Sequence, residues 1–394
     1  MSRILAVRSA FPAHRYQQHE LAKAVAAAAE SGGGLRPAQR VLLERLHANA
    51  EVATRYTVLP MTDYRSGGGG LPGPGAATLG AAAVNDRYIT EATALGERAL
   101  RSALDDSGLA ASELDLLIVT SVTGVAVPSL DALLIPRLGL RPDIKRLPVF
   151  GLGCVAGAAG LARLHDYLLA WPGQAAALLA VELCSLTLPR TEVTTADLVA
   201  SALFGDGAVG LVAVGDRAPG EQAPAAPPPG AQLARWPAPA APSPAPRPGR
   251  LPRVIATRSE VYPDSTDTLG WRLGPDGFRI VLTAELAEVV ERRLNGSVTA
   301  FLGAHGLTID DIATWICHPG GPKVLDAAQH ALKLPDSALA TSRRSLSEAG
   351  NMSSVSVLHI LELTLDDSPP EPGSFGLMIG LGPGVSAELL LLGW

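Results

Sequence analysis

Short apolar runs alternate with stretches of helical period along most of the chain, which predicts an α/β protein with largely buried strands. In the first half we expect helices at 86–107 and 128–138, strands at 114–120, 147–151 and 175–181, a helix beginning near Cys154, and a turn followed by a strand at 203–213. In the second half we expect strands at 253–257, 312–317, 375–380 and 387–392, and helices at 278–295, 297–305, 323–332 and 352–363.

This pattern occurs twice. Cys154 stands after a glycine at the start of one expected helix, and Asn351 stands after a glycine at the start of another, 197 residues later. His318 follows the strand at 312–317, and Thr120 ends the corresponding strand 198 residues earlier. We therefore interpret the chain as a duplication that places Cys, His and Asn at corresponding ends of the repeated elements.

A proline-rich segment separates the two halves. Twelve of the 32 prolines lie between Pro219 and Pro252, interleaved with alanine. Proline removes backbone donors and blocks both helices and sheet ladders, so an exposed linker or inserted loop is expected here. The predicted division is an N-terminal half at 1–214, an insertion at 215–253 and a C-terminal half at 254–394.

Composition narrows the class of protein. The chain has 394 residues, of which 47% are hydrophobic, and its net charge of -6 argues against a nucleic-acid-binding surface. No apolar run is long enough to predict a membrane span. The three cysteines lack metal-ligand spacing, so we expect no metal site and a reduced, cytoplasmic protein.

Cys154, His318 and Asn351 suit acyl transfer. A cysteine at a helix N-terminus faces unpaired N–H groups and the positive end of the helix dipole, and a nearby histidine adds to the bias toward thiolate. Such a thiolate can accept an acyl group, while the histidine and the amide stabilise the enolate formed when CO2 leaves a malonyl group. The plainer alternatives are a buried structural cysteine and an asparagine that only caps its helix.

Five motifs together resemble one family. They are Gly-Cys-Val-Ala-Gly around Cys154, Cys-His-Pro-Gly-Gly-Pro at 317–322, Gly-Asn-Met-Ser-Ser at 350–354, Gly-Leu-Gly-Pro-Gly at 380–384 and Leu-Phe-Gly-Asp-Gly-Ala at 203–208. They resemble the type III polyketide synthases, the relatives of chalcone synthase, in order over nearly the whole chain. The resemblance implies a thiolase fold, in which duplicated βαβα-type halves form five αβαβα layers. It also implies a homodimer, malonyl-CoA and acyl-CoA as substrates, and no cofactor.

The resemblance also implies roles for individual residues. Cys154 is the nucleophile, and His318 and Asn351 drive decarboxylation. Phe204 is the gatekeeper, Arg55 and Lys323 bind CoA, and Val127 crosses the dimer interface. The remaining cavity residues are Val122, Thr123, Cys184, Thr187, Trp271, Ile280, Ser353, Gly382 and Pro383.

The cavity positions give an expected product. Val122 and Cys184 stand where plant members usually have threonine, and Trp271 stands where plant chalcone synthases have glycine. These departures argue against an aromatic, coumaroyl-type starter. The segments at 122–131 and 150–157 are more similar to bacterial members that extend long-chain fatty acyl-CoA to alkylpyrones or alkylresorcinols. A naphthalene-forming member usually shows cysteine where Val122 stands.

Four alternatives stay open: a tetrahydroxynaphthalene-type synthase, a chalcone-type synthase with another starter, a ketoacyl-ACP synthase III-like enzyme that condenses once, and a thiolase-like subunit without chemistry. The synthase III relatives usually have His-Gln-Ala-Asn in place of His-Pro-Gly-Gly-Pro, and a subunit without chemistry should lack at least one of Cys154, His318 and Asn351.

Overall fold

The structure is a computed structural model that describes residues 1–31, 35–62, 81–187, 193–216, 251–274 and 277–394. Residues 217–250, which make up most of the predicted insertion, lie outside the described residues. The strands on either side of this stretch end at Gly215 and begin at Arg253.

The first half alternates strands with helices. Its described elements are β1 (Ser2–Ala10), β2 (His14–Gln17), α1 (Gln18–Ser31), α2 (Pro37–Ala48), β3 (Thr54–Thr57), α4 (Ala81–Ser107), η1 (Ala111–Glu113), β4 (Leu114–Thr120), α5 (Leu130–Leu138), β5 (Lys145–Val149), η2 (Gly153–Val155), α6 (Ala156–Ala170), β6 (Ala175–Leu183), η3 (Cys184–Thr187), α7 (Thr195–Leu203) and β7 (Asp206–Gly215), where η marks a 3-10 helix.

The second half repeats much of this order. Its described elements are β8 (Arg253–Val261), β9 (Leu269–Gly274), β10 (Gly277–Leu282), α8 (Leu286–Gly303), η4 (Ile309–Asp311), β11 (Ile312–Cys317), α9 (Pro322–Leu332), α10 (Ala340–Ala349), α11 (Ser354–Asp367), β12 (Phe375–Gly382) and β13 (Ser386–Gly393).

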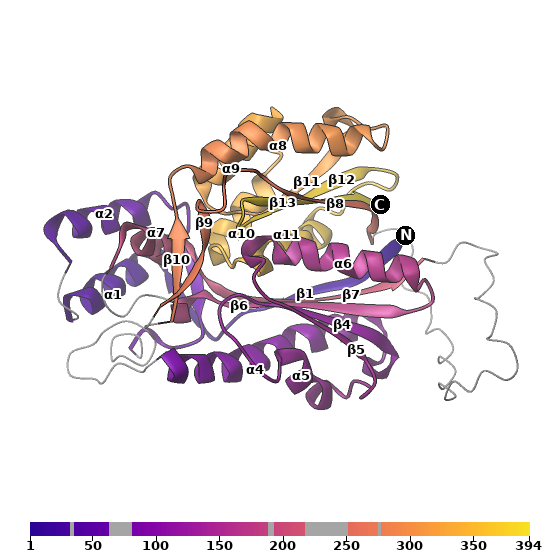
Figure 1. Cartoon of the computed structure of the whole chain (residues 1–394), viewed down its shortest axis with the longest axis horizontal. Helices are drawn as coiled ribbons and strands as arrows, with labels where there is room; N and C mark the ends of the chain where they lie inside the picture. Colours follow the sequence, from indigo (N-terminus) through magenta and orange to yellow (C-terminus); the bar gives the residue numbers. More distant parts are fainter. Residues whose placement is uncertain (32–34, 63–80, 188–192, 217–250, 275–276) are drawn as a thin grey trace, which may run out of the picture.

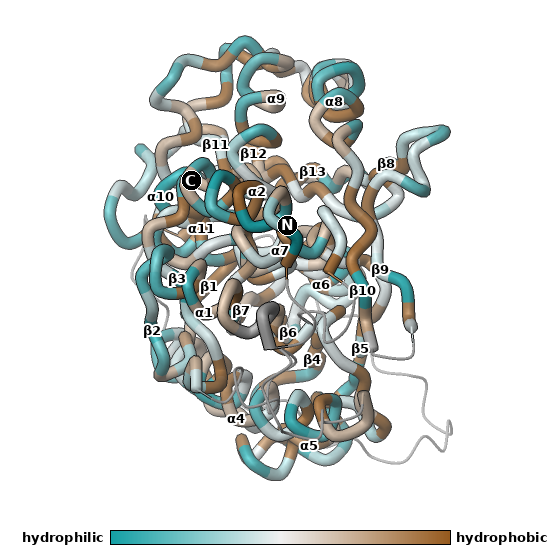
Figure 2. The backbone as a smooth tube through the Cα atoms, turned by 90° about the vertical axis from the view of Figure 1, so that its left-hand side faces the viewer, coloured by the Kyte–Doolittle hydropathy of each residue, from teal (hydrophilic) through white to brown (hydrophobic). Residues whose placement is uncertain are grey.

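These elements form five layers (Figure 1). Helices α4 and α5 cover one outer face, and α8 and α9 cover the other. Between them lie two groups of strands with α6 and α11 sandwiched in the middle. The outer helices carry both hydrophobic and hydrophilic positions in Figure 2, as expected for helices with one face on a sheet and one in solvent.

The strand order shows the duplication directly. The sheet runs β11-β12-β13-β8-β1-β7-β6-β4-β5, so the order β4-β6-β7-β1 in one half mirrors β11-β12-β13-β8 in the other. The two groups join only where β1 pairs with β8, at Ser2 with Val254 and Arg3 with Arg253. Strand β5 is an edge strand without a counterpart among the described strands of the second half.

The middle layer is the most buried part of the fold. Helices α6 and α11 contribute to one apolar cluster that also takes residues from strands of both halves. Gly157 of α6 lies so close to α11 that a Cβ there would be 2.0 Å from the carbonyl oxygen of Ser354. The crossing therefore brings the N-terminal ends of the two helices together, and these ends carry Cys154 and Asn351.

One sequence-based expectation was wrong. We expected 278–295 to be helical, but its first part is strand β10, which pairs antiparallel with β9. Phe278, Ile280 and Leu282 alternate with other residues at the period of a strand, and this local pattern prevails over the helical period that begins at Leu286. The two helices expected at 278–295 and 297–305 form the single helix α8.

We predict that Gly157→Ala destabilises the protein by about 1–3 kcal/mol, because the added methyl group collides with the Ser354 carbonyl and overpacks the crossing. Urea unfolding measures the change. The matched control is Gly296→Ala in α8, where a Cβ meets open space, and this variant should gain about 0.4–1 kcal/mol from reduced freedom of the unfolded chain. Equal effects of the two substitutions would contradict the close crossing.

Candidate active site

Cys154 lies in the turn that precedes α6. It is the middle residue of η2 and is 7% exposed. Gly153 before it has a φ of 61°, a left-handed conformation that favours glycine, and a Cβ at this position would lie 2.7 Å from the Pro383 ring. The turn therefore needs glycine both for its backbone conformation and for its packing.

His318 lies at the end of β11. Its backbone N–H donates to the Ile379 carbonyl of β12 at 2.9 Å, and its side chain is 2% exposed. The ring nitrogen Nδ1 is buried and has no hydrogen-bond partner among the described residues. Burial lowers the pKa of His318 to about 3, which favours the neutral imidazole.

Asn351 lies between α10 and α11 and is 2% exposed. Its amide nitrogen Nδ2 donates to the Gly320 carbonyl at 3.3 Å, and its Oδ1 accepts from the Ser353 N–H at 2.8 Å. Its main chain forms a bridge with Phe204, since its N–H donates to the Leu203 carbonyl at 2.8 Å and its carbonyl accepts from the Gly205 N–H at 3.0 Å.

The three residues are brought together by the contacts of their neighbours. Gly320, which binds the Asn351 amide, lies two residues after His318. Strand β12 binds the His318 main chain and continues to Gly382, where a Cβ would lie 2.6 Å from the nitrogen of Val155, the residue after Cys154. The loop that holds the predicted cavity residues Gly382 and Pro383 therefore packs directly on the Cys154 turn.

The electrostatics of Cys154 differ from the expectation drawn from the helix dipole. Burial raises the pKa of its thiol to about 12, while a contact with the Ser353 side chain lowers it. Because burial also favours neutral His318, a lone charge on either group is costly. The resting pair is therefore a neutral thiol and a neutral imidazole.

Ser353 stands between the cysteine and a buried carboxylate. Its hydroxyl is close enough to Cys154 and to Glu182 to lower the pKa of both, although it forms no hydrogen bond of ordinary geometry with any described residue. Its φ of 51° and ψ of −125° are unusual for a residue with a side chain, and such a backbone costs about 1–3 kcal/mol.

Glu182 is a residue that the sequence analysis missed. It is fully buried at the end of β6 and accepts hydrogen bonds from the Ser354 hydroxyl at 2.6 Å, the Val122 N–H at 3.0 Å and the Thr123 hydroxyl at 3.0 Å. Burial raises its pKa to about 7. The signal in the sequence was a single acidic residue inside an otherwise apolar strand.

The other predicted cavity residues lie around this centre. Val122 and Thr123 follow β4 and are each 4% exposed. Cys184 is buried in η3, where burial, and then the negative charge of Glu182, raise the pKa of its thiol. Thr187 ends the same turn, and its hydroxyl donates to the Cys184 carbonyl at 2.8 Å.

Trp271 and Ile280 lie opposite each other in the β9–β10 ribbon. The Trp271 ring packs against Phe204, with ring centroids 6.4 Å apart and planes inclined by 47°. The predicted gatekeeper is thus in contact with the largest of the predicted cavity residues.

The predicted CoA contacts and dimer contact lie in different surroundings. Arg55 is 4% exposed in β3, and its Nη1 donates to the Phe204 carbonyl at 2.8 Å, so its described contacts are within the protein. Lys323 is exposed in the first turn of α9. Val127, which precedes a cis proline, is 93% exposed. The CoA and dimer roles of these three residues stay predictions.

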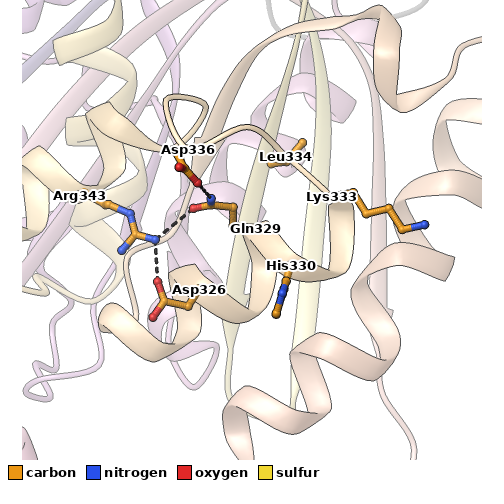
Figure 3. A pocket seen from close by; sticks show the side chains of 7 residues that line it. All are labelled: Asp326, Gln329, His330, Lys333, Leu334, Asp336 and Arg343. Atoms are coloured by element: carbon orange, nitrogen blue, oxygen red, sulfur yellow. Dashed lines mark hydrogen bonds and ion pairs between the residues drawn. The ribbon is translucent and has the colours of Figure 1, made fainter.

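A surface depression of about 700 Å³ lies elsewhere, near the end of α9 (Figure 3). Arg343 contacts Asp326 and Gln329 there, and Gln329 in turn donates to Asp336. These polar groups bond to one another, and none of the predicted site residues lines this depression. Within the described ranges, no three His, Cys, Asp or Glu side chains gather as metal ligands, and no helix is long and apolar enough to cross a bilayer.

The arrangement supports nucleophilic acyl transfer. A cysteine with a neutral histidine can lose its proton as it attacks a thioester, and an amide nitrogen with an N–H to spare can bind a developing oxyanion. Since all three residues are almost fully buried, hydrogen bonds to a developing charge are strong there.

The chain matches two family models, described as the N-terminal domain of chalcone and stilbene synthases over residues 1–217 and the C-terminal domain of the same enzymes over 253–393. It is 48% identical to a 1,3,6,8-tetrahydroxynaphthalene synthase of Streptomyces peucetius over 391 residues, which cover 99% of this chain and 93% of the relative. It is also 30% identical to a putative chalcone synthase of Bacillus subtilis over 79% of this chain and 80% of that protein.

Solved structures agree with these matches. The crystal structure of 1,3,6,8-tetrahydroxynaphthalene synthase from Streptomyces coelicolor superposes with a TM-score of 0.83 at 28% identity, covering 100% of this chain and 99% of that one. PKS-I from the brown alga Ectocarpus siliculosus gives the same TM-score at 26% identity, covering 99% of this chain and 97% of that one. The predicted thiolase fold, with its five layers and duplicated halves, is confirmed.

We predict that Glu182 makes the free energy of unfolding fall between about pH 4.5 and pH 7. The carboxyl titrates near 7 when folded and near 4.5 when exposed, so in this window the folded protein holds a proton that the unfolded chain has lost. Glu182→Gln should remove a slope of up to about 1.4 kcal/mol per pH unit.

Urea unfolding of both proteins at pH 5, 6, 7 and 8 measures this slope. Glu288→Gln, at an exposed position of α8, serves as the control and should leave the slope unchanged. Parallel curves for the wild type and Glu182→Gln would contradict the prediction, whatever their vertical offset.

Proposed function

The chain belongs to the chalcone and stilbene synthase family and is a type III polyketide synthase, and from this premise we propose that it builds a tetrahydroxynaphthalene-type product from malonyl-CoA alone. As a member of this family it acts on CoA thioesters and needs no cofactor. The observation that carries the proposal is the 48% identity to a 1,3,6,8-tetrahydroxynaphthalene synthase over 99% of the chain. This favours one of the alternatives over the long-chain alkylpyrone or alkylresorcinol product expected from the cavity positions.

The carbon count agrees with malonyl-CoA as the only substrate. Tetrahydroxynaphthalene has ten carbons, and a malonyl unit that loses CO2 leaves two, so five units supply the whole skeleton. Five malonyl-CoA give one tetrahydroxynaphthalene, five CO2, five CoA and one water, which balances all atoms. An alkyl starter has no place in this product.

The contact between Trp271 and Phe204 supports a small starter. The indole occupies the position that the resemblance gives to glycine in plant members, and it packs against the predicted gatekeeper. A bulky ring there reduces the space that a long alkyl tail would need. Val122 stands where naphthalene-forming members usually have cysteine. Its hydrogen bond to Glu182 comes from its main-chain N–H, so this contact does not depend on the type of side chain.

The first chemical step we propose is acyl transfer to Cys154. As the sulfur attacks the thioester carbonyl, its proton moves to neutral His318. The bond between the carbonyl carbon and the CoA sulfur breaks, and the imidazolium returns the proton to the departing CoA thiolate. This route suits a site where burial disfavours a lone thiolate and a lone imidazolium.

The second step is decarboxylative condensation. The bond to the malonyl carboxylate breaks, CO2 leaves, and the electron pair forms an enolate whose oxygen accepts a hydrogen bond from the Asn351 amide. The enolate carbon then attacks the acyl group on Cys154, and the sulfur leaves as the new carbon–carbon bond forms. Four such extensions of the starter unit make the pentaketide.

We also propose that the protein is a homodimer through the edge strand β5 and the loops beside it. Strand β5 lies at the edge of the sheet and is largely exposed, and an unpaired edge is a ready surface for association. The exposed apolar side chains on this strand and in the adjoining loops are Val125, Val127, Leu147, Phe150 and Leu152. The loops after β4 and β5 are adjacent, since the Ser121 N–H donates to the Val149 carbonyl.

We predict that the purified protein converts malonyl-CoA alone to a product of formula C10H8O4, and that adding hexanoyl-CoA or palmitoyl-CoA yields no product containing the alkyl chain. Mass spectrometry identifies the products. Cys154→Ala should form no polyketide but keep some CO2 release, because decarboxylation does not require the acyl-enzyme. Cys317→Ala, at a buried cysteine used for packing, is the matched control and should keep product formation.

Alkylpyrones or alkylresorcinols from palmitoyl-CoA, without a product from malonyl-CoA alone, would reject the naphthalene proposal and restore the long-chain reading. Full turnover by Cys154→Ala would reject the assignment of the nucleophile.

We predict that Val127→Glu converts the dimer to monomers, because a carboxylate at the centre of an apolar interface is left without solvent. Light scattering after gel filtration measures the mass. Val127 is 93% exposed in one subunit, so the substitution should not disturb the fold of that subunit. Val41→Glu, at a 66% exposed position on α2, is the control and should leave the mass unchanged. A wild-type protein that elutes as a monomer would reject the proposal.

A further inference from the structure

Arg55 carries a charge into the interior beside the candidate site. It lies in β3 opposite Tyr16 of β2 and is 4% exposed. Its Nη1 donates to the Phe204 carbonyl at 2.8 Å, while its Nε and Nη2 have no hydrogen-bond partner among the described residues. Asp206 lies near enough to favour the charge, but all its described hydrogen bonds come from Ser185 and Val58.

This environment is unfavourable for a group that only stabilises the fold. Burial lowers the pKa of Arg55 to about 10, against the opposing effect of Asp206, so the side chain still carries its charge at neutral pH. A buried charge with unpaired donors costs free energy, and apolar residues of similar volume often serve stability as well or better. The presence of arginine therefore calls for a role other than stability.

Arg55 touches both strands of the Phe204–Asn351 bridge. On one side it binds the Phe204 carbonyl at the end of α7, where a positive charge is also favoured by the helix dipole. On the other side its stem packs on Gly350, where a Cβ would lie 2.9 Å from Arg55 Cδ and 3.0 Å from Cγ. Gly350 has a φ of 73°, so this position favours glycine for its backbone as well.

The bridge joins the main chain of Phe204, the predicted gatekeeper, to that of Asn351, whose amide takes part in the proposed decarboxylation. Its hydrogen bonds run from Asn351 to Leu203 and from Gly205 to Asn351, at 2.8 and 3.0 Å. A shift of the Phe204 main chain would therefore move the Asn351 main chain with it. The positions of the Asn351 amide and of the Phe204 ring therefore both depend on this short segment of paired backbone.

We propose that Arg55 is a positioning residue, which holds the Phe204–Asn351 bridge in register through the Phe204 carbonyl and the Gly350 backbone. The proposal rests on the function proposed above for Asn351 and Phe204. It replaces the CoA-binding role that the sequence suggested for Arg55, since a side chain buried behind this bridge is not presented to a phosphate group in solvent.

The test compares two substrates, only one of which carries the group that a CoA-binding residue would contact. Malonyl-CoA carries the nucleotide and its phosphates, and the N-acetylcysteamine thioester of malonate lacks both. We expect Arg55→Met to lower kcat for CO2 release by a factor on the order of 10 to 100 with both thioesters, the size expected for a small misplacement of a catalytic group. The ratio of the two losses should be close to one.

Arg15→Met is the matched control. Arg15 lies on the neighbouring strand β2, is exposed, and contacts Thr54 and the Tyr56 ring rather than the bridge. Its replacement removes the same charge and should leave kcat with both thioesters unchanged. Thermal unfolding of each variant separates a loss of folded protein from a loss of rate per folded molecule.

Two outcomes would overturn the proposal. A defect of Arg55→Met confined to malonyl-CoA, seen as a raised KM, would assign Arg55 to the nucleotide, and an unchanged kcat with both thioesters would remove it from the site. If Arg55→Met does not fold, Arg55→Lys keeps the charge but has a single donor nitrogen in place of the guanidinium's three, and we expect severalfold losses that are equal for the two thioesters. Unequal losses, or none, would again overturn the proposal. Failure of the wild type to form a naphthalene product leaves this comparison intact, because it measures decarboxylation alone.

Discussion

The close crossing of α6 and α11 is the constraint on which the rest of the structure depends. The two helices approach until only glycine fits at Gly157, and their N-terminal ends meet between the two groups of strands. Each end carries one polar residue of the candidate site, Cys154 before α6 and Asn351 before α11. A wider crossing would separate Cys154 from the Asn351 amide, so the proposed chemistry requires the close packing of the middle layer.

Burial gives this site its chemical character. A buried site strengthens hydrogen bonds to a developing oxyanion, and it also disfavours any isolated charge. The pKa of Cys154 is raised and that of His318 is lowered for the same reason. In the first step that we propose, proton transfer between them during attack avoids both penalties. Glu182 and Arg55 also bring ionisable side chains into this interior, and each contacts a loop beside the site.

The sequence predicted the architecture well where the pattern was local. The strands at Leu114–Thr120 and Ile312–Cys317 have the bounds expected from their apolar runs, and the duplication was visible from the spacing of Cys154 and Asn351. The error at β10 also arose from local patterns. The alternating pattern of the strand ends at Leu282, close to the start of a longer helical pattern, and the predicted helix was extended back over the strand. Residues 277–282 form a strand because they pair with β9, and a short stretch of sequence does not reveal such pairing.

The sequence by itself determined the fold, the family and the three residues proposed for chemistry, because these depend on residue types at fixed spacing. Only the tertiary structure decided the surroundings of each side chain. It showed that Arg55 is buried and binds the Phe204 carbonyl, and that Trp271 packs on the Phe204 ring. It also showed that Glu182 accepts hydrogen bonds from both the Val122 loop and the start of α11. Burial and charge are properties of contacts between residues far apart in the chain, so the order of residues alone does not reveal them.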